Sequence, residues 1–150
     1  MATSIEQLSF SLTASELAEQ ERALSGLRTC AGTVLASASI ACSFLVARIG
    51  KGSLDVLGVC ATISFVLCLF SSVWVLLPHT FVFSFRGESL LLQSDRAGRD
   101  LREAYRAAGI WMEPHVQANR KMIAMLAGWL TASCVLLALE VVLWTLRVGC

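Results

Sequence analysis

Three long uncharged stretches constrain the fold of this 150-residue chain more than any other feature of its sequence. They cover residues 29–47, 56–77 and 122–146, and the only formal charge inside them is Glu140. A helix of roughly 20 apolar residues crosses the ~30 Å hydrocarbon core of a bilayer. Because lipid offers the backbone no hydrogen-bond partner, such a stretch crosses a membrane as an α-helix. The sequence therefore predicts an all-α integral membrane protein with three transmembrane helices and cytoplasmic helical extensions.

Composition agrees with one membrane-embedded unit. Hydrophobic residues make up 56% of the chain, and its mean hydropathy is +0.69. Soluble domains contain about 45–50% apolar residues. The stretches divide the chain into a cytoplasmic N-terminal helix, a transmembrane helical hairpin, a cytoplasmic helical segment and a third transmembrane helix, which cover residues 1–28, 29–78, 79–121 and 122–150.

Local signals set the expected ends of the helices in the two cytoplasmic segments. Thr13 and Glu16 have the spacing of a capping box, which predicts that the N-terminal helix begins there. Gly109 is expected to end one helix of the second segment. Pro114 suits the first turn of the next helix, which is expected to run into the third span.

The first span differs in composition from the other two. Thirteen of the nineteen residues in 29–47 are Ala, Gly, Ser, Thr or Cys. Small residues let membrane helices approach closely, so their packing holds the helices together. Gly32 and Ala36 are two small residues four positions apart, the spacing typical of such helix contacts, and so are Ser39 and Ser43. Two interpretations follow: this face packs against the other spans of the same chain, or it contacts a second copy.

Basic residues predict the orientation in the membrane. With three spans, residues 1–28 and 79–121 share one side and carry nine Lys and Arg residues, whereas the other side carries three. Loops rich in Lys and Arg stay in the cytoplasm. We therefore expect a multi-pass protein of the plasma membrane with a cytoplasmic N-terminus.

Glu140 is the first candidate functional residue because an ionisable group within a span is costly and is a functional hypothesis by default. One interpretation is structural: Glu140 pairs with Arg48 or Lys51, or its side chain reaches the headgroups. The alternative is that Glu140 lines a pore or an ion path.

A stripe of arginines forms the second candidate. Arg99, Arg102 and Arg106 follow a spacing of i, i+3, i+7, and guanidinium groups suit the phosphate of lipid headgroups or of a nucleotide. The alternative is a solvated helix face that nearby acidic residues neutralise. The net charge of +1 indicates no general attraction to nucleic acid.

Catalytic and metal-binding motifs are absent from the sequence. There is no Gly-x-Ser-x-Gly, no phosphate-binding glycine loop and no His-Glu-x-x-His. The six cysteines form no Cys-x-x-Cys pair, and His79 and His115 are isolated. We expect no catalytic, cofactor or metal site, and interpret the cysteines as small packing residues rather than as disulfide or metal partners.

The layout of the chain resembles a known family. A polar N-terminal helix leads into a span rich in small residues, and a second span ends in proline. A polar helical stretch then leads through residues 119–122 (Asn-Arg-Lys-Met) into a final span that ends with Leu-Glu-Val-Val-Leu-Trp at 139–144. This order is similar to that of the Pycsar transmembrane effectors of bacterial conflict systems, their SLATT-type relatives and similar actinobacterial integral membrane proteins.

The resemblance implies a non-enzymatic effector that forms homo-oligomers in the lipid bilayer. It would impair the membrane when a nucleotide signal or a soluble cytoplasmic partner activates it in an antiviral defence system. Residues 28–31 keep only the alanine of the Asp-x-Lys-Ala-like motif of the family, so no binding residue is transferred. The alternative function is a membrane anchor or accessory subunit whose cytoplasmic helices dock a soluble partner.

Overall fold

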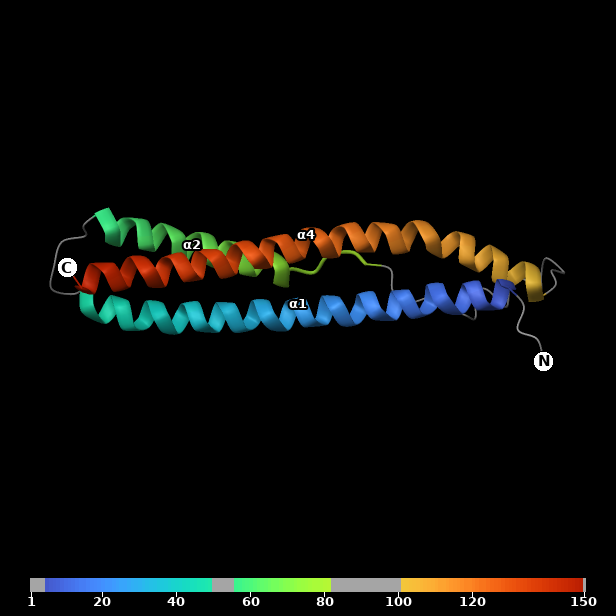
Figure 1. Cartoon of the computed structure of the whole chain (residues 1–150), viewed down its shortest axis with the longest axis horizontal. Helices are drawn as coiled ribbons and strands as arrows, with labels where there is room; N and C mark the ends of the chain where they lie inside the picture. Colours follow the sequence, from blue (N-terminus) through green and yellow to red (C-terminus); the bar gives the residue numbers. More distant parts are fainter. Residues whose placement is uncertain (1–4, 50–55, 82–100, 150) are drawn as a thin grey trace. The chain divides into compact units, whose positions relative to one another are not determined.

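The computed structural model of the chain describes residues 5–49, 56–81 and 101–149, with side chains for 5–43, 56–81 and 102–146 (Figure 1). Helix α1 covers Ile5–Ile49, α2 covers Val56–Leu76 and α4 covers Leu101–Gly149. These described ranges contain no β-strand. The predicted all-α class is therefore confirmed.

The helices contribute to two compact units. Unit 1 comprises Met1–Leu24 and His79–Ala124, and unit 2 comprises Ser25–Pro78 and Met125–Cys150. Unit 1 therefore contains the first part of α1 and the first part of α4, while unit 2 contains the remainder of both helices together with α2.

Unit 1 packs two helical segments around a small apolar core. Leu17 of α1 and Met112 and Val116 of α4 are buried in it, and Phe10 packs against them. The ring of Phe10 also contacts Tyr105, with the ring centres 5.3 Å apart. Large apolar side chains thus form this core, and others of the same unit, such as Leu12 and Ile110, are exposed.

Unit 2 has the opposite arrangement. Its buried positions hold mostly small or polar residues, which include Ala31, Ala38, Ala61, Ser64, Cys68, Ser71, Ser72, Ser133 and Glu140. Large apolar side chains of α2 and α4 face outward instead, among them Ile63, Val66, Phe70, Val135, Leu139 and Val142. The Cys68 thiol contacts the Ser133 carbonyl at 3.4 Å, which places α2 against α4.

Buried positions recur every seven residues on all three helices. On α1 they are Leu17, Leu24, Ala31 and Ala38; on α2 they are Ala61, Cys68 and Val75; on α4 they are Met112, Asn119, Leu126, Ser133 and Glu140. A strict seven-residue repeat keeps one seam of a helix against its neighbour and gives left-handed helix packing. The repeat therefore explains why Glu140 points into the interior of unit 2.

Two helices are apolar and long enough to cross a membrane, judged by length and composition among the described residues. They are α2 and α4, the latter within Arg102–Leu146. Helix α1 does not qualify within its described side chains, because its apolar stretch consists mostly of small residues and the side chains from position 44 onward lie outside the description. The fold thus contains two candidate spans, and the third stays a prediction.

The predicted capping box is wrong. Helix α1 is already helical at Ile5, and the hydroxyl of Thr13 donates to the carbonyl of Ser9 at 3.0 Å, as a hydroxyl does within a helix. Glu16 pairs with Arg120 instead. Packing of Phe10 against the core of unit 1 keeps the residues before Thr13 in the helix.

The predicted helix break between Gly109 and Pro114 is also wrong. Both residues lie inside α4, which is one continuous helix. Proline inside a helix removes one backbone hydrogen bond and is costly. Here Ala108, Met112 and Val116 are buried along one face, so packing extends across the proline and offsets its cost.

Candidate functional site

Glu140 occupies the interior of unit 2. Its side chain is completely buried, at 0% exposure, and neither carboxyl oxygen has a hydrogen-bond partner among the described residues. Cys42 of α1 and Cys68 of α2 lie within electrostatic range of it. The predicted partners Arg48 and Lys51 lie outside the described side chains. The structure therefore places the acid in the interior of unit 2, and its pairing with Arg48 or Lys51 stays a prediction.

Two buried hydroxyl groups of unit 2 bond within their own helices. Ser133 donates to the carbonyl of Trp129, and Ser64 donates to the carbonyl of Cys60, each at 3.1 Å. A buried charge needs a partner or a strong hydrogen bond to offset its desolvation. These serines do not supply one to Glu140, so the site has the chemistry of a carboxyl group that binds a proton or a cation.

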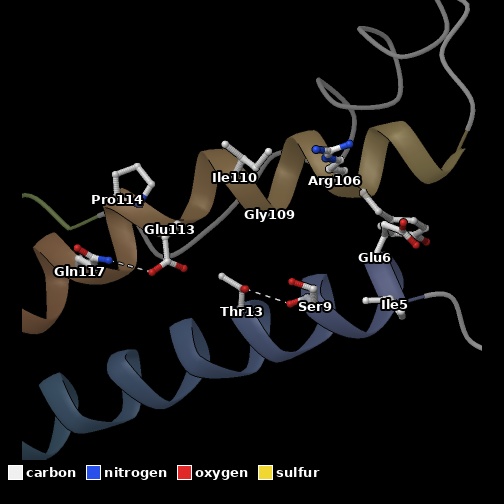
Figure 2. Close-up of a pocket in the computed structure, with 11 residues that line it drawn as sticks. Ile5, Glu6, Ser9, Thr13, Arg106, Gly109, Ile110, Glu113, Pro114 and Gln117 are labelled. Carbon is white, nitrogen blue, oxygen red and sulfur yellow. Dashed lines mark hydrogen bonds between the residues drawn. The ribbon is translucent and has the colours of Figure 1, made fainter.

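A groove in unit 1 is the second candidate site (Figure 2). Its volume is about 650 Å³, within the range of small-molecule sites. Residues of α1 and α4 line it: Ile5, Glu6, Ser9, Thr13, Tyr105, Arg106, Gly109, Ile110, Glu113, Pro114 and Gln117.

Charges of both signs line this groove. Arg106 contributes a guanidinium group, and Glu6 and Glu113 contribute carboxylates. The amide of Gln117 donates to Glu113 at 2.9 Å, as Figure 2 shows. Because Pro114 has no N–H, it cannot donate to the carbonyl of Ile110 one turn earlier. The groove therefore combines the guanidinium group of Arg106 with the carboxylate of Glu113, while the carboxylate of Glu6 is already bonded to Arg102.

The structure describes two of the three arginines of the predicted stripe, both on α4. Arg102 donates from Nε to Oε1 of Glu6 at 2.7 Å, so its charge is neutralised within unit 1. Arg106 lines the groove. Arg99 lies outside the described residues. The predicted stripe stays a prediction, with Arg102 engaged by a carboxylate of the same unit.

Sequence reasoning identified Glu140 but missed the groove. The groove depends on two helical segments that lie far apart in the sequence, and its only local signal is Pro114, which favours a helix start. In the part of the chain that the structure describes, no three His, Cys, Asp or Glu side chains gather as metal ligands.

Comparison with known proteins assigns no family to this arrangement of sites. No family model, no curated protein and no solved structure matches the chain.

Proposed function

We propose that this chain is a non-enzymatic membrane protein that assembles into homo-oligomers and perturbs the integrity of the bacterial plasma membrane in a defence-type system. The membrane location is supported by the arrangement of unit 2, in which the large apolar Val66 and Phe70 face outward while Ser133 and Glu140 face inward. Lipid solvates large apolar side chains and leaves small or polar groups for helix contacts. In this proposal the second part of α1 also crosses the membrane, so that the chain has three spans.

The outward face of α1 in unit 2 supports assembly. Cys30, Thr33, Ala36, Ser37 and Ser39 are exposed on it and are small, beside the larger Ile40. The hydroxyls of Thr33 and Ser37 donate to the carbonyls of Thr29 and Thr33, so neither would place an unpaired hydrogen-bond donor in the bilayer. Such a face permits close approach of another helix, and a second copy supplies one.

Reporter fusions test the topology. A periplasm-active reporter after Cys150 should be active, and reporters at the N-terminus and at Ala108 should be inactive. If only α2 and α4 cross the membrane, the reporters at the two termini report the same side. That outcome would show that α1 does not cross the membrane. It would also contradict a cytoplasmic location of both residues 1–28 and residues 79–121.

Expression and crosslinking test the effector activity. Expression of the wild type beside its native neighbouring genes should depolarise the cell, and Glu140→Gln should reduce the depolarisation at unchanged abundance.

Oxidation should crosslink two copies through Cys30, and Cys30→Ser should abolish the dimer. The control Cys60→Ser changes an exposed cysteine on α2 and should leave the dimer intact.

The groove of unit 1 favours a second function, a membrane anchor or accessory subunit that docks a soluble partner. Its exposed Ile5, Ile110 and Pro114 offer apolar contact beside the carboxylate of Glu113. This function replaces the effector if expression leaves the membrane potential unchanged and a purified product of a neighbouring gene binds the wild type but not Ile110→Arg.

A further inference from the structure

The interior of unit 2 contains an acid whose environment does not support its charge. Both oxygens of Glu140 lack a hydrogen-bond partner among the described residues, and its side chain is sealed from the surface. Among the described side chains, the titratable groups that face it from the neighbouring helices are the thiols of Cys42 on α1 and Cys68 on α2. The side chains of Arg48 and Arg147 lie outside the described set.

The neutral acid fits this environment better than the carboxylate. An isolated carboxylate in a low-dielectric interior loses its hydration and gains nothing in return. A protonated carboxyl group carries no net charge and keeps an O–H that can donate. The packed arrangement of unit 2 is thus compatible with a proton on Glu140 and incompatible with its loss.

We propose that Glu140 is a proton-binding site that controls the opening of unit 2. The packed unit holds the proton on the Glu140 carboxyl group. When the helical segments separate and water enters, the O–H bond breaks, the proton passes to water and the carboxylate remains hydrated. This inference deepens the proposed function, because opening is the step by which the unit would breach the bilayer.

The size of the effect follows from proton linkage. When one proton is released on opening, the equilibrium between packed and open unit shifts by up to about tenfold per pH unit. Opening is favoured as the pH rises and is suppressed as it falls. Glu140→Gln removes the titrating group, so its opening should not follow the pH.

Infrared spectroscopy tests whether the proton is present. The full chain is reconstituted in vesicles of phosphatidylcholine and phosphatidylglycerol at neutral pH. The difference spectrum of wild type minus Glu140→Gln should show the carbonyl stretch of a protonated carboxylic acid. A difference spectrum with carboxylate bands only, as an ion pair with Arg48 would give, overturns the proposal.

Cysteine labelling tests whether the proton controls opening. Cys68 is completely buried, whereas Cys134 is exposed on α4. N-ethylmaleimide crosses the membrane, and peptide mass spectrometry measures the two sites separately. The Cys68 to Cys134 labelling ratio should rise with pH in the wild type, by up to about tenfold per unit more than in Glu140→Gln. Equal pH dependence in both proteins overturns the proposal.

A matched control separates the proton from general packing. Ser133→Ala removes a buried hydroxyl that bonds only within α4 and leaves the carbonyl that Cys68 contacts. Its labelling ratio should keep the wild-type pH dependence, and loss of that dependence overturns the assignment to Glu140. If Glu140→Gln does not accumulate, the wild type alone tests the proposal. Its carboxylic-acid infrared band and the protection of Cys68 from labelling should disappear together as the pH rises.

Dye release from the same vesicles distinguishes this proposal from the proposed function. Release that rises with pH in parallel with Cys68 labelling supports both. Labelling that follows the pH without dye release keeps the proton-binding site and overturns the effector function. Dye release that is independent of pH and unchanged in Glu140→Gln overturns the proton control and keeps the effector function.

Discussion

Units 1 and 2 differ in the residues that fill their interiors. Unit 1 buries Leu17 and Met112, and the ion pairs described in it include exposed arginines. Unit 2 exposes Val66 and Phe70 and buries serine, alanine and Glu140. Both units use the same seven-residue repeat of buried positions, so the periodicity of the helices does not explain the difference.

The difference teaches that the repeat sets which face is buried, whereas the surroundings set what that face contains. In water, burial of large apolar side chains stabilises a helix pair. In lipid that gain vanishes, and close packing of small residues and polar contacts take its place. On α4 the repeat runs through Met112 and Asn119 in unit 1 and through Leu126, Ser133 and Glu140 in unit 2, so its last two positions hold a serine and an acid.

The largest expected effect comes from a charge on the outward face of unit 2. Val66 lies at the middle of α2 and is 55% exposed. Val66→Arg should disfavour membrane insertion by about 2.5–3.5 kcal/mol. The measurement is the fraction of chain that resists carbonate extraction from membranes.

The matched control for this substitution lies in unit 1. Leu12 is 61% exposed on α1, and Leu12→Arg should change stability by less than about 0.5 kcal/mol because water solvates the new charge. Equal tolerance at the two positions would break the comparison, since the outward face of unit 2 would then be in water as well.

A smaller effect is expected from the apolar core of unit 1. Met112 is 2% exposed and packs with Leu17 and Val116. Met112→Ala should cost about 2 kcal/mol, at the low end for such a truncation because the core is small. Hydrogen exchange of α1 and α4 amides in the full chain measures the loss as faster local opening.

Ile110 gives the control for this truncation. It is 67% exposed on the same helix, so Ile110→Ala should leave the exchange rates of unit 1 nearly unchanged. Should Met112→Ala change them no more than Ile110→Ala does, the core of unit 1 contributes little, and the contrast with unit 2 loses its energetic basis.

Sequence patterns captured the helices better than their ends. Long apolar runs predicted α2 and the second part of α4, and Pro78 lies just past the end of α2 at Leu76. Thr13 and Pro114 misled because their local preferences compete with burial of Phe10 and Met112 between distant segments. Such tertiary contacts outweigh a capping box or a proline and are not written in the local sequence.

The candidate sites show the same division. Glu140 was identifiable because a charge within an apolar run is conspicuous, but its burial without a partner follows from the position of α4 against its neighbours. Exposure of Ala36 and Ser39 could not be derived from spacing, because the part of α1 in unit 2 buries Ala31 and Ala38 instead. The groove needed knowledge of which helical segments pair.

The smallest expected effects concern the ion pairs of unit 1, which would have no counterpart in a lipid-facing unit. Arg102 pairs with Glu6, whose side chain is 20% exposed, and Arg120 pairs with the more exposed Glu16. Exposed pairs contribute about 0.2–1 kcal/mol, and salt screens them.

Double-mutant cycles with alanine, measured by hydrogen exchange, should give a larger coupling for Glu6–Arg102, because its carboxylate is less screened by water. High salt should reduce the coupling of Glu16–Arg120 more. If neither coupling responds to salt, water does not reach these pairs, and the assignment of unit 1 to an aqueous environment is wrong.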